Sequence, residues 1–122
     1  MTARSFRVLG VADHDAWSAW LTAIPVNEGE NPHGARVRHI AATGETILQI
    51  QVAQFFWVCP GCGGTAGGAL GEKPVSGWDA PRWVRSGPLS RLTLTPSLGC
   101  PLWRRDRCDG HWWLRDGLLE LA

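Results

Sequence analysis

The cysteine pair in "FFWVCPGCGG", residues 55–64, is the feature that most restricts how this chain can fold. A C-x-x-C spacing places Cys59 and Cys62 on one tight turn, and the glycine after the second cysteine lets backbone amides face its sulfur. A structural zinc ion needs four ligands in a tetrahedron, so this turn supplies only half of such a site. The other ligands must come from elsewhere in the chain, and a shared metal would then join two distant segments.

The second half of the site is predicted near the end of the chain, in "CDGHWWLRDGLLEL", residues 108–121. Cys108 and His111 have the spacing of a ligand pair and come directly before an apolar run. Cys100 lies eight residues before Cys108, so the four cysteines can also form a Cys₄ site that leaves His111 free. The spacing leaves both ligand sets open: Cys100, or His111 in its place, completes the site.

The bulk properties of the chain exclude several classes of protein. A length of 122 residues predicts one domain, and a net charge of +1 gives no strong field for nucleic acid or an anionic membrane. No window approaches the roughly 18–20 apolar residues of a membrane span. The N-terminus lacks the apolar region of a secretory signal, so we expect a cytoplasmic protein. In that reducing compartment four cysteines indicate metal ligands rather than disulfides.

The N-terminal half is predicted to contain one helix and a hairpin. Residues 5–11 read as a strand, and Asp13 can cap a helix that ends before Pro25. Residues 35–42 and 45–59 alternate apolar and polar side chains, which predicts two strands joined by a turn at Thr43–Gly44.

The C-terminal half is predicted to consist of short β elements around the cysteines. The glycine-dense residues 59–71 predict a tight metal-binding turn at Cys59–Cys62, called the knuckle below, followed by a flexible stretch rather than a strand. Residues 91–98 read as a strand, and residues 111–121 as a closing hairpin with its turn at Asp116–Gly117. The predicted fold is therefore α+β: a small, mostly antiparallel β domain with one N-terminal helix. A zinc-ribbon-like Cys/His site joins two of its hairpins.

A serine in "TLTPSLGC" suggests chemistry as well as structure. Ser97 follows a predicted strand, its hydroxyl can point out of the sheet, and the Gly99 amide could face an oxyanion. A nucleophilic serine needs a base within about 3 Å, and His111 is the only histidine on a segment with other reactive groups. The alternative is that Ser97 is an ordinary turn residue without a catalytic role, and the sequence alone does not distinguish these two interpretations.

The order of these motifs resembles the BubE family of bacterial ubiquitination-like (Bub) operons, and related phage proteins often labelled "ammonia monooxygenase". The resemblance rests on "WVCPGCG", "LTLTPSLG" and "CDGHWWLRDGLLEL", and it covers about residues 55–122. Residues 1–54 match no family pattern. Two positions depart from the family: the knuckle reads CPGCG where members carry CPCGC, and Cys100 stands where members usually carry asparagine.

The resemblance implies a zinc-containing serine peptidase that removes ubiquitin-like proteins from conjugates. Ser97 would be the nucleophile and His111 the general base. The implied zinc ligands are Cys59, Cys62 and Cys108, and Cys100 can restore the fourth thiol. If His111 instead binds zinc it cannot act as the base, and the chain would be a non-catalytic zinc module that binds a protein partner or serves as a phage accessory or structural protein. Nucleic-acid binding is the least favoured function, because acidic residues interrupt the arginines of residues 104–107 beside Trp103.

Overall fold

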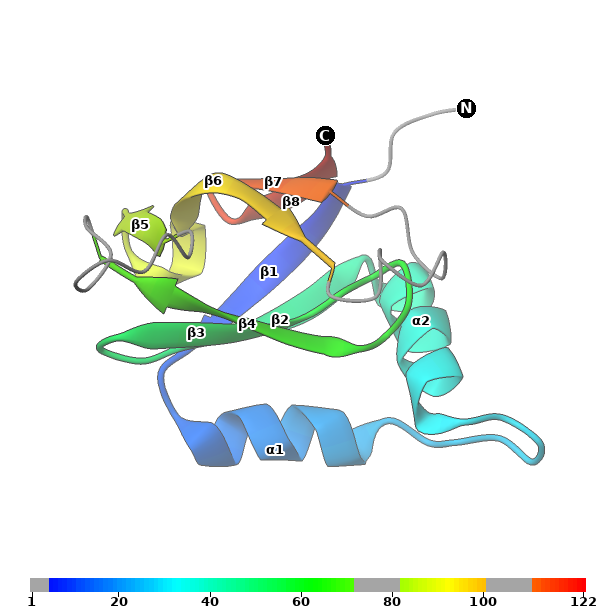
Figure 1. Ribbon diagram of the computed structural model, residues 1–122. Coiled ribbons are helices and arrows are strands. Elements are labelled where there is room, and N and C mark those ends of the chain that lie inside the picture. Colours follow the sequence, from blue (N-terminus) through cyan, green and yellow to red (C-terminus); the bar gives the residue numbers. More distant parts are fainter. Residues whose placement is uncertain (1–4, 72–81, 101–110) are drawn as a thin grey trace.

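The computed structural model describes residues 5–71, 82–100 and 111–122 of the chain, and within these ranges eight strands close into a barrel (Figure 1). Neighbouring strands in the barrel follow the order of the sequence, and β8 pairs with β1 to close it. The strands are β1 (Ser5–Val11), β2 (Glu45–Ile50), β3 (Gln54–Val58), β4 (Thr65–Leu70), β5 (Arg82–Ser86), β6 (Thr93–Gly99), β7 (His111–Arg115) and β8 (Leu118–Leu121). The helices are α1 (His14–Ala23), α2 (Pro32–Thr43) and the short 3₁₀ helix η1 (Leu89–Arg91).

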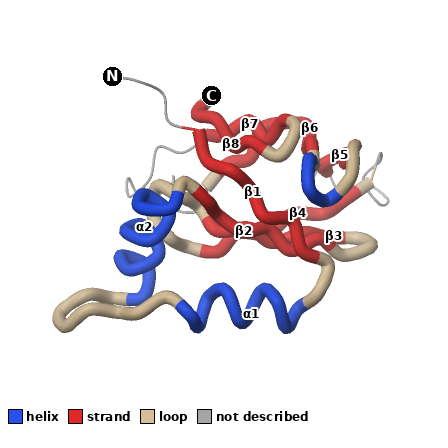
Figure 2. The backbone as a smooth tube through the Cα atoms, turned by 180° about the vertical axis from the view of Figure 1, so that it is seen from behind, coloured by secondary structure: helices blue, strands red, loops and turns tan. Residues whose placement is uncertain are grey.

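The predicted fold class is wrong, because the sheet is a closed barrel with two helices rather than a set of antiparallel hairpins with one. Strand β1 runs parallel to β2, and β4 runs parallel to β5. Parallel neighbours cannot be joined by a tight turn and need a long crossover, which is usually helical. Helices α1 and α2 form that crossover between β1 and β2; α1 runs beneath the strands and α2 stands beside them (Figure 2).

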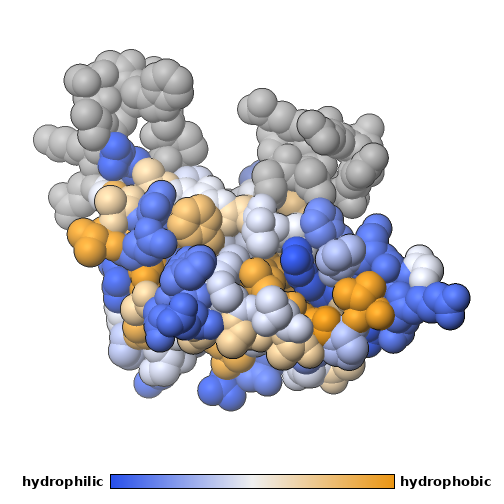
Figure 3. All heavy atoms as spheres, turned by 90° about the horizontal axis from the view of Figure 1, so that it is seen from below, coloured by the Kyte–Doolittle hydropathy of each residue, from blue (hydrophilic) through white to orange (hydrophobic). Residues whose placement is uncertain are grey.

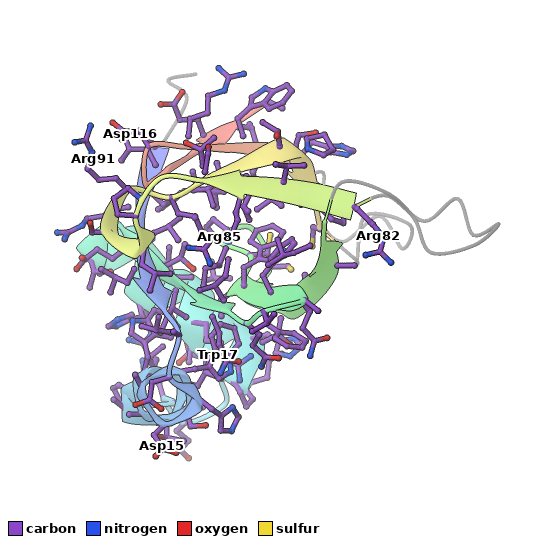
Figure 4. All side chains as sticks on the ribbon, turned by 90° about the vertical axis from the view of Figure 1, so that its left-hand side faces the viewer. Asp15, Trp17, Arg82, Arg85, Arg91 and Asp116 are labelled. Carbon is purple, nitrogen blue, oxygen red and sulfur yellow. The ribbon has the colours of Figure 1, made fainter. Side chains whose placement is uncertain are left out.

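The prediction for the first helix is confirmed. The Asp13 side chain accepts a hydrogen bond from the Asp15 amide at 2.8 Å, which caps the free N–H groups at the start of α1. Trp17 lies between α1 and the sheet and is buried, whereas Asp15 points away on the opposite side of the helix (Figure 4). None of the helices in the described part of the chain is long and apolar enough to cross a membrane.

The strand predicted for residues 35–42 is part of a second helix, α2. Asn31 caps its start by accepting from the Gly34 amide at 2.7 Å, and Pro32 occupies the first turn. At the other end Gly44 adopts a left-handed φ of 73° and donates its N–H to the Ile40 carbonyl. The predicted Thr43–Gly44 turn is therefore a helix C-cap, and these capping residues outweigh the short alternating pattern between them.

The glycine-dense segment after the knuckle is also misassigned, since residues 65–70 form strand β4. Its glycines make room for aromatic rings on both faces of the sheet. A Cβ on Gly68 would lie 2.7 Å from Phe55 Cε1 and 2.8 Å from Trp83 Cε3, two rings that meet edge to face. A Cβ on Gly67 would lie 2.9 Å from Phe56. The missing side chains are thus a packing requirement rather than a source of flexibility.

The closing hairpin is confirmed, and a second contact holds its turn in place. Asp116 and Gly117 both have positive φ, at 54° and 79°, as expected for a two-residue hairpin turn. The Asp116 carboxylate accepts from Arg91 Nε at 2.8 Å and from Arg91 Nη2 at 3.1 Å (Figure 4). This pair ties the β7–β8 turn to η1.

The hydrophobic core lies inside the barrel and under the helices. Its fully buried large side chains include Ile40, Ile47, Leu48, Phe55, Leu92, Leu94, Leu98, Leu114 and Leu119. Buried apolar surface of this kind supplies the main favourable term in folding.

The aromatic contacts of β4 predict that Gly68→Ala destabilises the protein. The added methyl group forces the Phe55 and Trp83 rings apart, and overpacking of this type typically costs about 1–3 kcal/mol. The free energy of unfolding in urea measures the effect. Glu120→Ala, at an exposed position of β8, is the control and leaves it nearly unchanged. A Gly68→Ala protein as stable as the parent would show that the rings do not constrain this strand.

Candidate functional site

Three cysteines from two distant segments meet in one cluster at the end of the barrel. The Sγ atoms of Cys59, Cys62 and Cys100 all lie within 4.8 Å of one another, and those of Cys62 and Cys100 are 3.3 Å apart. Cys59 and Cys100 are buried, and Cys62 is half-buried. The pair predicted from the C-x-x-C motif and the more distant Cys100 therefore lie close enough to bind one ion.

The donor set suits a metal ion bound by thiolates. Such an ion binds sulfur at about 2.3 Å, so two thiolates of one tetrahedral site lie roughly 3.8 Å apart. The three Sγ atoms occupy a space of this size. The cluster can therefore hold a metal ion, and it supplies three of the four ligands that a tetrahedral site requires.

Backbone hydrogen bonds of the knuckle shape this cluster. The Cys59 amide donates a hydrogen bond to the Gly64 carbonyl at 2.9 Å, and the Gly63 amide donates one to the Cys59 carbonyl at 2.8 Å. The Gly64 amide faces Cys62 Sγ at 3.4 Å, as the sequence predicted for amides next to a thiolate. Gly63 has a φ of 72°, and a Cβ there would overlap the backbone carbonyl of His33. Only glycine therefore fits at this position of the turn.

The fourth predicted cysteine, Cys108, lies outside the described residues. His111 is the first residue of β7 and is exposed, and it is not part of the three-cysteine cluster. It is the direct cross-strand neighbour of Gly99 in β6. The His111 ring lies over Gly99, with Nε2 3.2 Å from the place that a Cβ would occupy. The absence of a side chain at Gly99 gives the imidazole its position.

Ser97 lies on β6, two residues before Gly99. The register between β6 and β7 shifts between Leu94 and Leu98, and Ser97 is part of this irregular stretch, directly before the buried Leu98. Ser97 is half-buried, and its carbonyl accepts a hydrogen bond from Trp83 Nε1 at 3.2 Å.

The pairing of β6 with β7 places Ser97 and His111 on neighbouring strands. Among the described residues no hydrogen bond joins the Ser97 hydroxyl to the His111 ring, and the predicted dyad stays a prediction. Catalytic hydrogen bonds often tighten only when substrate is bound. The chemistry that these two strands offer is that of a hydroxyl and an imidazole, next to the backbone of Gly99.

The other three histidines lie away from these two strands. The ring of His39 meets Trp20 edge to face between the helices, and His14 Nε2 lies 3.3 Å from the Ser18 hydroxyl. His14 and His33 line a separate groove beside α1. That groove also contains Gln49, a buried residue that the sequence motifs did not single out, because nothing in a strand pattern marks an amide that has no protein partner.

The strongest electrostatic effects also lie elsewhere. Hydrogen bonds from Arg91 lower the pKa of the exposed Asp116 carboxyl, and a hydrogen bond from Arg38 lowers the pKa of Glu30. Both pairs are surface ion pairs. The Arg91–Asp116 pair holds the β7–β8 turn, and the Arg38–Glu30 pair holds the start of α2. Neither pair involves a candidate reacting group.

Comparison with known proteins points to one family. The chain matches the model of the bacterial ubiquitination-like system serine protease family, BubE, over residues 30–122. The match begins well before residue 55, where the motif resemblance begins. Curated proteins and solved structures gave no match.

The geometry predicts which side chains bind a metal ion. Cobalt(II), added to the reduced apoprotein, should give strong thiolate-to-metal absorption that is lost in Cys100→Ser, because Cys100 lies within the cluster. His111→Ala should keep the absorption, because the imidazole lies outside the cluster. Ultraviolet–visible titration of the three proteins measures this. Loss of the bands in His111→Ala, in a protein that still folds by circular dichroism, would place the histidine on the metal.

Proposed function

Because the chain belongs to the BubE family of bacterial ubiquitination-like system serine proteases, we propose that it is a zinc-stabilised serine peptidase that cleaves ubiquitin-like protein conjugates. The observation that supports this proposal is the pairing of β6 with β7, which sets the His111 ring over Gly99, two residues after Ser97.

In the proposed reaction the His111 imidazole accepts the proton of the Ser97 hydroxyl as its oxygen attacks the carbonyl carbon of the substrate amide. The imidazolium then donates that proton to the leaving amine, and the C–N bond breaks to give an acyl-serine. Water, deprotonated by the same imidazole, hydrolyses the ester and restores the serine.

Zinc has a structural role in this proposal. Its ligands would be Cys59, Cys62, Cys100 and Cys108, and His111 would remain free as the base. The first two cysteines follow β3, and Cys100 follows β6, so the ion would join opposite parts of the barrel next to the proposed catalytic residues. Zinc bound by four thiolates has no open position, so it stabilises the fold and takes no part in the reaction.

A non-catalytic zinc module that binds a protein partner is the second candidate. It is favoured by the lack of a direct hydrogen bond between Ser97 and His111, because a serine without a base is a poor nucleophile. The two candidates share the metal and differ in whether the serine reacts.

Loss of the serine hydroxyl should therefore abolish activity without changing the fold. Ser97→Ala should lower the rate of hydrolysis of a ubiquitin-like conjugate from the same bacterial system by at least about 10³-fold, as expected for removal of a nucleophile. Gel-based cleavage assays measure the rate. Ser90→Ala, at an exposed position of η1, is the matched control and retains activity. Equal activity in Ser97→Ala, or no activity in the parent toward any conjugate, would leave the zinc module as the function.

The structural role of zinc gives a separate prediction. Purified protein should hold about one zinc ion per chain, and Cys62→Ser should lose it together with several kcal/mol of stability, because metal binding to such a site is coupled to folding. Elemental analysis and urea denaturation measure the two quantities. A reduced parent protein without zinc, or a Cys62→Ser protein that unfolds like the parent, would contradict the structural role.

A further inference from the structure

A groove of about 590 Å³ lies between helix α1, the first turns of α2 and the outer face of β2, β3 and β4. Figure 1 shows α1 running beneath the strands, and the groove lies along this helix. Seen from the side of α1, the surface mixes hydrophilic and hydrophobic residues (Figure 3). The groove is formed by other strands than β6 and β7, which carry Ser97 and His111.

The feature that marks this groove as a binding site is a side-chain amide that faces it without a protein partner. Gln49, the fifth of the six residues of β2, is only 3% exposed and lines the groove. Its side-chain amide forms no hydrogen bond with any residue in the described ranges. By contrast, the buried Thr46 hydroxyl on the same strand donates to the Val58 carbonyl at 2.7 Å. The only fully buried side-chain polar atom without a partner among the described residues is Trp112 Nε1, so the Gln49 amide is open to the groove and can pair with a ligand there.

The groove is also positive in character. Arg36 lines it and is half-buried, and it uses one nitrogen to bond the Gly63 carbonyl at 3.1 Å. Its guanidinium carries five N–H donors, so further donors remain for a ligand. The imidazoles of His14 and His33 lie in the same lining, and none of its described residues is acidic. A lining that carries an arginine and two imidazoles, with no acidic residue among its described members, favours a ligand with a carboxylate.

Apolar side chains complete the lining. Trp17 and Leu21 come from one face of α1, and Phe56 comes from β3. The groove extends along α1 from His14 to Leu21, a distance of roughly 10 Å at about 1.5 Å per residue. An extended chain rises about 3.3 Å per residue, so the groove has room for about three residues.

We propose that this groove binds an extended peptide segment that ends in a carboxylate. The Gln49 amide both donates and accepts, which matches the N–H and C=O of a peptide backbone. Arg36 pairs with the terminal carboxylate, and the apolar lining receives one aliphatic side chain. The site is separate from the proposed catalytic residues, and it would exist even if Ser97 were unreactive.

The test uses the full-length protein and N-acetyl-Leu-Gly-Gly, a short peptide with a free carboxylate. Nuclear magnetic resonance titration of the ¹⁵N-labelled protein should show saturable shifts of the Trp17 indole and the Gln49 side-chain amide. The C-terminal amide of the same peptide should bind about tenfold more weakly, because it lacks the charge that pairs with Arg36. Gln49→Leu should abolish binding, and Arg36→Gln should reduce the affinity for the free acid to that for the amide.

A control variant and a stability measurement accompany this titration. Arg115→Gln changes an arginine on β7 outside the groove and should leave the titration unchanged. Each variant is compared with the parent by thermal melting, so that a loss of binding is read only from folded protein. Absence of shifts at millimolar peptide, equal binding by Gln49→Leu, or stronger binding of adenosine monophosphate at the same resonances would overturn the proposal. Ser97→Ala should bind the peptide normally, which separates this result from any failure of the peptidase hypothesis.

Discussion

Strand β1 pairs with β2 in parallel on one side and with β8 in antiparallel on the other, and this double pairing closes the sheet. The rest of the structure depends on it. A parallel neighbour can be reached only by a long crossover, so the chain must place α1 and α2 between β1 and β2. The crossover covers part of the outer face of β2, β3 and β4, and the part that it leaves open is the groove that contains Gln49. Closure also removes free strand edges, which protects a small sheet from pairing with other chains.

The two candidate sites use different properties of the same barrel. The cysteine cluster lies where β3 and β6 end, so a metal ion there would connect segments that are far apart in sequence. The segment with Ser97 and His111 depends on the pairing of β6 with β7, in which Leu98 and Trp112 are buried and His111 lies opposite Gly99. The glycine at 99 lets the imidazole lie close to the sheet. Membership of the BubE family is the reason for proposing that these two residues act as a serine nucleophile and its base.

Several glycines in this chain admit another group rather than provide flexibility. Gly68 admits the Phe55 and Trp83 rings, and Gly99 admits the His111 ring. Gly63 admits the His33 carbonyl beside the knuckle. A sequence dense in glycine is therefore compatible with a rigid sheet when aromatic or backbone groups occupy the space that side chains would fill.

The sequence by itself determined the local elements with strong terminal signals. Asp13 and the apolar spacing after it determined α1, Asp116–Gly117 determined the closing hairpin, and the C-x-x-C motif identified the knuckle. The motif order also identified the family, because short motifs around reactive groups can be read one at a time.

Only the tertiary structure decided how these elements combine. Residues 35–42 fit a strand or a helix by their pattern, and the caps at Asn31 and Gly44 together with the crossover between β1 and β2 select the helix. The glycine run became a strand because the rings it accommodates come from other strands. The proximity of Cys100 to the knuckle, the position of the His111 ring over Gly99 and the groove beside Gln49 all depend on pairings between residues far apart in sequence. Such pairings arise from closure of the barrel, and no local pattern encodes them.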